Sequence, residues 1–440
     1  MHPIIALRQL DDLQKQIVTL LLRSPNGLAQ KDVIAKLANS VSQPTISRAM
    51  AKLIENDIVE KTGETRSSLY KLSEAATWFA KPPHHRPEKP YEPHRIGGYI
   101  PNVTAWLPVE QRNRMTLAAQ GVNQALDAST YSREIAQRFL IDLAWASSSL
   151  EGNTYSYLDT EVLLQYGQKA TGHDLEEATM ILNHKHAIDE LIENVGRPVL
   201  DQKFASRIHA MLLRDLISPE DLGRVRGNSV RIQGSSYRPE GDAYQLSSDL
   251  GQLLWKAEQV EDPFEASFVL LTGLSYLQAF IDGNKRMGRL MSNVPLLWKG
   301  LPPISFIGVD RNAYLSGLIL FYELGDPSLI AEAVVDGYVE NSKNYAAAVA
   351  TRRVPRSIEF RERTRIDHLV ARIVDDQIDE TDARSAALEF FADLEEEDRE
   401  HLAQIVESII AAISPENAYA WRVDPEKVEA YLNRGRRNGF

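Results

Sequence analysis

The sequence predicts a mainly α-helical protein with three parts: an N-terminal module of three helices plus a β-hairpin, a central all-α bundle with a small hairpin, and a C-terminal helical extension. Apolar residues recur at helical spacing along most of the 440 residues. Short alternating runs typical of strands occur near residues 58–72 and 230–239. A proline- and histidine-rich stretch, residues 81–111, separates the first module from the rest. We therefore expect domains at 1–80, 112–345 and 346–440.

The composition excludes several classes of protein. With 43% hydrophobic and 25% charged residues and no low-complexity tract, the chain can bury cores throughout its length. It has no cysteine, which excludes disulfides, thiolate nucleophiles and cysteine-ligated zinc. Neither a signal peptide nor an apolar run of 18 residues is present, so we expect no membrane partner and a cytoplasmic location.

Only the N-terminal module is even mildly basic. The net charge of the chain is −12, whereas residues 1–80 carry ten Lys and Arg against eight Asp and Glu. The spacing of apolar residues predicts helices over 10–23 and 30–38 and a third helix that begins after Ser42. Two short strands, 58–61 and 68–72, follow it as a hairpin.

This order of elements resembles the winged helix-turn-helix of bacterial regulators, with SQPTISRAMAKLIENDIVEKTG as recognition helix and following strand. The resemblance implies a DNA partner, because such a helix fits the major groove and its first polar side chains can reach base edges. Winged helices also serve as protein–protein or dimerisation modules, and this alternative stays open. The side chains expected to contact bases or phosphates are Gln43, Thr45, Ser47, Arg48, Lys52 and Arg66.

The segment between the first two domains is predicted to be an extended linker that lies on a neighbour. Its histidines, His84, His85 and His94, are scattered among prolines and lack the helical or hairpin spacing of a metal site.

One loop in the central region has the composition of a phosphate site. Residues 280–289, FIDGNKRMGR, place a glycine turn at the start of a helix, where free backbone N–H groups attract an anion. Arg286 and Arg289 are three residues apart and share a helix face, and Asp282 is a suitable ligand for Mg²⁺. The alternative is a structural turn whose arginines pair with acidic residues of the same domain.

The loop resembles the signature of the Fic/Doc family, His-x-Phe-x-Asp/Glu-Gly-Asn-x-Arg-x-x-Arg. The resemblance implies a nucleotide site for ATP with Mg²⁺ and a protein target that receives AMP. By this resemblance, Phe280 anchors the core and Asp282 binds Mg²⁺. The residues that bind phosphate are then Gly283, Asn284, Lys285, Arg286 and Arg289, of which Lys285 stands at a variable position of the signature.

The match fails at Gln278, which stands where the family has its catalytic histidine. An imidazole with a pKa near 6.5 accepts a proton at physiological pH, whereas an amide does not. Loss of a general base slows a reaction by about 10²–10⁴-fold. We therefore expect a pseudoenzyme or a weakened enzyme. His209 lies in a helical run, RIHAMLL, and is expected to be packed rather than catalytic.

Two upstream segments extend the resemblance. SSSLEGN, residues 147–153, is similar to the inhibitory helix of autoinhibited Fic proteins, which implies that Ser147, Glu151 and Gly152 form that motif and that Glu151 pairs with Arg289. The alternative is a plain helix end at Gly152. Residues 230–239 are similar to the family's flap hairpin, which holds a target by strand addition and would include Ile232, Gly234 and Tyr237.

The sequence leaves three functional hypotheses. The first is a DNA-binding regulator with a disabled Fic pocket that binds nucleotide or holds the chains of a homo-oligomer. The second is an active nucleotidyltransferase that attaches AMP to a protein hydroxyl. In the third, Glu151 acts as the base that removes AMP from a modified protein. Residues 346–440 predict amphipathic helices and indicate no site.

Overall fold

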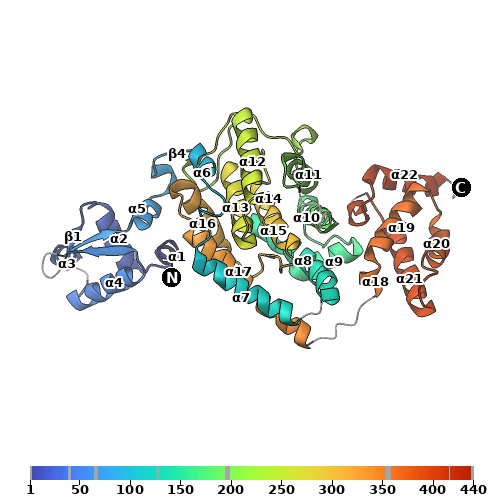
Figure 1. Ribbon diagram of the computed structural model, residues 1–440, viewed down its shortest axis with the longest axis horizontal. Helices are drawn as coiled ribbons and strands as arrows, with labels where there is room; N and C mark the ends of the chain where they lie inside the picture. Colours follow the sequence, from blue (N-terminus) through green and yellow to red (C-terminus); the bar gives the residue numbers. More distant parts are fainter. Residues whose placement is uncertain are drawn as a thin grey trace.

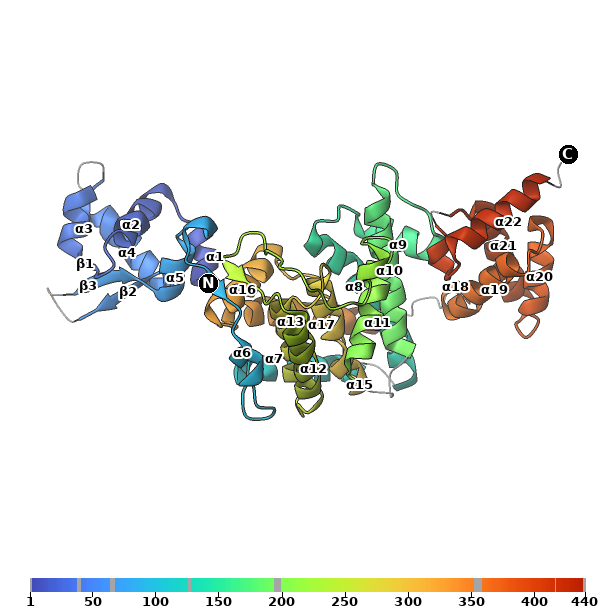
Figure 2. The same cartoon turned by 90° about the horizontal axis from the view of Figure 1, so that it is seen from above.

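The computed structural model describes residues 2–37, 41–63, 68–125, 128–193, 199–351, 358–415 and 417–437. These residues are mainly helical. They form three units along the long axis of the molecule, with the N-terminal unit (blue) and the C-terminal unit (red) at opposite ends of a central helical unit (Figure 1). The view from above gives the same order (Figure 2). No helix within the described ranges is long and apolar enough to cross a membrane.

The N-terminal unit, residues 2–80, has its own small core. Its elements are α1 (Pro3–Arg8), α2 (Asp12–Leu22), β1 (Leu28–Ala29), α3 (Gln30–Leu37), α4 (Gln43–Glu55), β2 (Val59–Thr62), β3 (Leu69–Leu72) and α5 (Glu74–Phe79). The strands form one antiparallel sheet in the order β1-β3-β2. Ile17, Val33, Ile46 and Ile58 are fully buried and hold the helices against it. The three predicted helices and both predicted strands are present within two residues of their expected ends, whereas α1, β1 and α5 carried no clear pattern.

The segment that follows, residues 81–108, packs along the central unit. It contains β4 (Lys89–Pro90) and α6 (Pro93–Gly97), and Ile96, Tyr99 and Leu107 are buried in the central core. The buried carboxylate of Glu265 accepts hydrogen bonds from the Trp106 amide (2.7 Å), the Leu107 amide (2.9 Å) and the Tyr99 hydroxyl (3.0 Å). These bonds hold the segment against the bundle.

The central unit is an all-helical bundle. Its helices are α7 (Val109–Ala125), α8 (Ala128–Glu151), α9 (Tyr157–Tyr166), α10 (Leu175–Glu193), α11 (Gln202–Leu213), α12 (Ala243–Glu258), α13 (Pro263–Leu277), α14 (Asn284–Met291), α15 (Val294–Trp298), α16 (Arg311–Leu324) and α17 (Ser328–Thr351). α13 lies at the centre, and every residue from Phe264 to Leu277 is buried. The apolar spacing of residues 285–299 predicts one helix, but the structure divides this run into α14 and α15. Pro295 cannot donate a helical hydrogen bond, and the Asn293 side chain instead bonds to Arg289 O and Ile304 O.

The flap segment, residues 228–238, differs from the expected hairpin. A small sheet is present, but its strand β5 (Tyr237–Arg238) pairs in parallel with β4, with Lys89 opposite Tyr237. The second strand thus comes from the segment before α6 and not from the flap itself. Gly234 turns the chain with φ +79°, and Tyr237 is then directed into the core, where its hydroxyl donates to Tyr276 O at 3.0 Å.

The C-terminal unit packs on α9 and α10 through buried contacts. Its elements are α18 (Ile358–Arg361), α19 (Arg363–Asp375), α20 (Ala383–Phe390), α21 (Glu396–Ala412), the 3₁₀ helix η5 (Ala418–Trp421) and α22 (Pro425–Arg437). The buried Lys185 ammonium of α10 donates to Ala420 O at 2.6 Å. Gly167 lies so close to Trp421 that any side chain there would overlap the indole.

Candidate functional site

The loop between α13 and α14 is shaped to receive an anion. Gly283 is the N-cap of α14, with φ +74°, and a Cβ atom at this position would overlap the Leu213 side chain. No side chain caps the helix, so the N–H groups of its first turn face the loop. Unpaired amides at a helix start and the helix dipole favour a negative charge.

Asn284 holds the loop closed rather than facing a ligand. Its side-chain oxygen accepts from the Phe280 amide at 2.9 Å, and its side-chain nitrogen donates to Phe280 O at 2.8 Å. The same nitrogen lies 3.3 Å from Gln278 Oε1. Asn284 can therefore offer only its backbone N–H to the predicted anion site. Its side chain fixes the turn.

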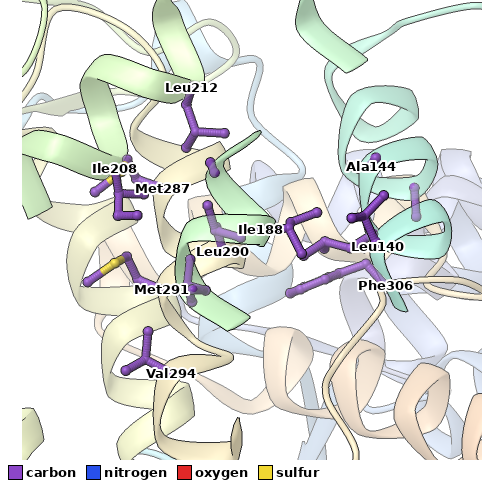
Figure 3. Close-up of a cluster of buried hydrophobic side chains, with 14 of the residues drawn as sticks. Leu140, Ala144, Ile188, Ile208, Leu212, Met287, Leu290, Met291, Val294 and Phe306 are labelled. Carbon is purple, nitrogen blue, oxygen red and sulfur yellow. The ribbon is translucent and has the colours of Figure 1, made fainter. Parts of the chain in front are cut away.

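Apolar contacts on one side of α14 hold the helix in place. Met287, Leu290 and Met291 gather with Ile208 and Leu212 of α11 in one buried cluster (Figure 3). On the side that packs against α13, a Cβ atom at Gly288 would come within 2.7 Å of Leu271 O, so the two helices pack at close range.

One hydrogen-bond donor of Arg286 has no acceptor. Its guanidinium is buried and bonds through Nη2 to Asp282 at 2.8 Å, while its Nη1 is buried and has no hydrogen-bond partner. A buried N–H without an acceptor costs free energy, which an anion in the loop would recover. Asp282 is largely exposed, with 62% of its side-chain surface accessible.

The carboxylate of Glu151 bridges two cations of the loop. Glu151 is the last residue of α8, and its oxygens lie 2.7 Å from Arg289 Nη2 and 2.8 Å from Lys285 Nζ. Arg289 is fully buried and also donates to Ser147 Oγ (2.9 Å) and Ser147 O (3.1 Å). The structure thus brings together Ser147, Glu151 and Arg289, as the sequence predicted, and adds Lys285. Gly152, with φ +104°, ends the helix directly after the carboxylate.

The two cations of this bridge strongly favour the ionised form of Glu151. Burial alone would raise the pKa of Glu151, but the charges of Arg289 and Lys285 outweigh burial and lower the pKa to about 2. Glu151 is therefore ionised at any physiological pH, and it pairs with both cations while offsetting one of their two positive charges.

A buried histidine that the sequence did not single out supports Ser147. His184 of α10 bonds through Nδ1 to Met180 O at 2.8 Å and through Nε2 to Ser147 Oγ at 2.9 Å. Burial lowers the pKa of His184 to about 3, so the ring is neutral. Since a carbonyl only accepts, Nδ1 carries the proton and Nε2 accepts from the Ser147 hydroxyl, whose lone pairs then face Arg289. No motif marks this residue in the sequence.

The loop lies in a segment that matches a known protein family. Residues 199–296 match the model of the Fic/DOC family. This segment is similar to Fic/DOC domains, and we refer to it as the Fic domain. Over 176 residues the chain is 27% identical to the protein adenylyltransferase Fic of Nematostella vectensis. The aligned region covers 38% of this chain and 40% of that protein. A Fido domain-containing protein of Dictyostelium discoideum is 34% identical over 87 residues, 19% of this chain and 61% of the relative. The chain thus matches less than two thirds of the length of either relative.

Solved structures of similar proteins include Fic-1 of C. elegans and a Fic family protein of Desulfovibrio desulfuricans G20. The first has a TM-score of 0.46 and 19% identity and covers 54% of this chain and 71% of its own. The second has a TM-score of 0.45 and 18% identity and covers 59% and 80%.

Gln278 caps the C-terminal end of α13 and begins the loop between α13 and α14. It adopts a left-handed conformation (φ 50°, ψ 47°), and its side-chain nitrogen donates to Ser275 O at 2.7 Å. The neighbouring imidazole, His209, is packed as expected. It stacks on Phe280 with 4.0 Å between ring centroids and lies 3.2 Å from Asp282 O, and burial lowers its pKa to about 4. His209 therefore supports the loop by packing against it, and its ring is not placed to act as a base.

The predicted flap residues lie within the matched segment, in different environments. Ile232 is half-buried against the core, Gly234 forms the turn, and Tyr237 is fully buried. Arg226, which the sequence analysis missed, donates to Gln278 O at 2.6 Å and so ties the start of the flap to the end of α13.

Among the residues predicted to contact DNA, Gln43, Arg48 and Lys52 lie exposed on α4. Thr45 and Ser47 are half-buried and already engaged: Thr45 lies 2.8 Å from the Ser42 hydroxyl, and Ser47 accepts from the Gln30 amide group at 3.0 Å. The remaining predicted residue, Arg66, lies outside the described residues.

Proposed function

We propose that the Fic domain binds a nucleoside triphosphate with Mg²⁺, that Glu151 closes this site in the resting protein, and that AMP transfer is absent or weak. The observation that carries the proposal is the bridge from Glu151 to Arg289 and Lys285. Without the carboxylate, two cations would face the loop unpaired, one of them fully buried. A terminal phosphate supplies the negative charge that would replace it.

The residues of the loop suit the proposed ligand. The free Nη1 of Arg286, the uncapped start of α14 and the turn at Gly283 together offer donors to phosphate oxygens. In the described ranges, no group of three or more His, Asp or Glu side chains could hold a metal ion. Mg²⁺ binds readily through one carboxylate and the phosphates of its nucleotide, and Asp282 is the carboxylate that we assign to it.

The chemistry at Gln278 supports weak or absent transfer. If Gln278 stands at the position of the family's histidine, the target hydroxyl has no base, because an amide does not accept a proton at physiological pH. Removal of AMP by Glu151 is disfavoured by the same criterion, since a carboxylate with a pKa of about 2 is a poor base.

The direct test is calorimetric titration of Mg-ATP into the wild type and Glu151→Gly. We expect weak or no binding by the wild type and clear binding by the variant. Glu258→Gly is the matched control, because Glu258 also ends a helix but is exposed on α12. If neither the wild type nor Glu151→Gly binds ATP or another nucleoside triphosphate, the proposal fails.

We also propose that the N-terminal unit is a winged helix that binds DNA through α4. The exposed Arg48 and Lys52 on that helix are placed to meet phosphates beside Gln43. Fluorescence anisotropy with a mixed-sequence duplex should show salt-sensitive binding, and Arg48→Ala and Lys52→Ala should each weaken it and reduce the slope against log salt by about 1. Lys15→Ala on α2 is the control. Binding that is equally affected by all three substitutions would contradict the assignment.

A further inference from the structure

The buried carboxylate of Glu323 joins three segments that are distant in the sequence. Glu323 lies near the end of α16, and its side chain has no exposed surface. It accepts hydrogen bonds from the Trp78 indole and from Arg86 Nη1, which lies 3.1 Å away. It also accepts from the Ser235 hydroxyl and the Ser236 amide, both at 2.6 Å. One side chain therefore contacts the N-terminal unit, the segment that follows it, and the flap segment.

A buried carboxylate of this kind makes its partners depend on one another. Only 6% of the Arg86 side-chain surface is exposed, and its guanidinium also lies 4.6 Å from the ring centroid of Phe79. Breaking a buried ion pair by loss of one partner is strongly unfavourable, because the other charge remains buried without compensation. We therefore expect the hydrogen bonds to Glu323 to form and break cooperatively.

The N-terminal unit also rests on α16 through apolar contacts. Ile4 of α1 forms a small cluster with Leu320 and Leu329, and the ring of His2 lies 3.1 Å from the Ser328 hydroxyl. A shift of the N-terminal unit relative to α16 would therefore break the contact between Trp78 and Glu323 as well.

On its other side, the flap segment is connected to the loop between α13 and α14, which we call the phosphate loop after its proposed ligand. The Lys89 amide donates to Ser236 O at 3.0 Å in the sheet of β4 and β5. The next residue, Tyr237, donates to Tyr276 O in the last turn of α13, and Gln278 follows two residues later. The flap segment thus lies between the N-terminal unit and the start of the loop.

We propose that Glu323 is a positioning residue through which the N-terminal unit sets the position of the flap segment beside the phosphate loop. Glu323 acts through Ser235 and Ser236. Displacement of the N-terminal unit from α16 would release the flap, and because coupling between two sites is reciprocal, a ligand that orders the flap would favour the docked N-terminal unit. The effect on nucleotide binding rests on the proposed function, whereas the positioning of the flap does not.

Hydrogen exchange of the full-length protein tests the positioning. Trp78→Phe removes the indole donor and keeps a ring, and Glu323→Gln keeps the shape but places an N–H group against donors. We expect both variants to speed exchange in peptides covering residues 228–238 by roughly 5-fold, the effect of losing about one hydrogen bond. Trp255→Phe, at an exposed position of α12, should leave these peptides unchanged. Unchanged flap exchange in both variants, or an equal increase in α13 and α17, would overturn the proposal.

A second measurement distinguishes coupling from simple support of the fold. In the Glu151→Gly background, Trp78→Phe should change the affinity for Mg-ATP by at least about 3-fold, and Trp255→Phe should not. Unchanged affinity together with faster flap exchange would contradict the link to the nucleotide site. If Glu151→Gly itself binds no nucleotide, the proposed function fails, and hydrogen exchange still decides the role of Glu323.

Discussion

At the scale of single residues, the proposed closure of the site depends on how Glu151 is paired. The carboxylate pairs with Arg289 and Lys285 at once, although its side chain keeps 17% of its surface exposed. A carboxylate that can reach solvent from a buried pair can also leave it. Its departure would leave Arg289 and Lys285 unpaired unless another anion replaced it, and this requirement links the proposed autoinhibition to ligand binding.

The low pKa of Glu151 predicts a stability difference that depends on pH. The pKa falls from 4.5 to about 2 on folding, so the bridge contributes about 3 kcal/mol above pH 4.5. This contribution should shrink by about 1.4 kcal/mol per pH unit as the pH falls from 4.5 toward 2, because the unfolded chain takes up the proton first. Urea denaturation of wild type and Glu151→Gln at pH 6 and pH 3.5 measures it. A difference that is the same at both values would contradict the assigned bridge.

Restoring a base should restore transfer. In the Glu151→Gly background, Gln278→His is expected to raise self-modification by about 10²–10⁴-fold, because an imidazole can accept the proton of a hydroxyl and an amide cannot. Transfer of radiolabel from α-labelled ATP to the protein measures the gain, and Gln278→Asn is the control without a base. If the double variant binds ATP and still transfers nothing, Gln278 is not the residue that limits transfer.

At the scale of elements, α14 carries the site, and its start depends on one glycine. Gly283→Ala would force a side chain into φ +74° and against Leu213. We expect it to destabilise the protein by roughly 1–3 kcal/mol and to abolish Mg-ATP binding in the Glu151→Gly background. Gly300→Ala, with φ +62° and open space around it, should cost about 1 kcal/mol and leave binding intact. Denaturation and titration of both variants check this, and equal effects would remove the special role of the turn.

The elements also show what the sequence could and could not predict. Amphipathic patterns over about 131–150, 174–194, 201–215, 243–258 and 262–280 predict helices, and these ranges match α8, α10, α11, α12 and α13 closely. The expected flap hairpin differed, because Ser236 and Tyr237 find their partners in a distant segment and in the core. Local alternation of apolar residues does not reveal such a partner.

The candidate site was predicted to a similar extent. The spacing of Ser147 and Glu151, together with the family motif, indicated contact with Arg289. The second cation on Glu151 and the support of Ser147 by His184 were missed, because both depend on how separate helices pack and neither belongs to a local pattern.

At the scale of the whole molecule, two helices of the central unit serve as docking surfaces. α16 holds the N-terminal unit through Glu323, and α10 holds the C-terminal unit through Lys185. The residue before Lys185 is His184, which supports Ser147 in the site. The two outer units therefore contact helices that also hold the flap segment or support Ser147 beside Arg289.

Buried histidines of the central unit predict how its stability depends on pH. Burial lowers the pKa values of His184 and His186 to about 3 and that of His209 to about 4. Below pH 6.5 the unfolded chain binds protons that the folded chain does not, so stability should fall with falling pH, by up to about 4 kcal/mol per pH unit. Denaturation between pH 8 and pH 5 measures the slope, and His186→Gln should reduce it by about a third. Stability that does not change over this range would contradict neutral burial of these rings.

The central claim is that a terminal phosphate and the Glu151 carboxylate compete for the same cations. Titration of Mg-ATP and Mg-ADP into the wild type and Glu151→Gly tests it most directly. We expect the substitution to strengthen ATP binding by about 10-fold or more and ADP binding much less, because only ATP carries the phosphate that would take the place of the carboxylate. An equal gain for both nucleotides, or no gain for either, would contradict it.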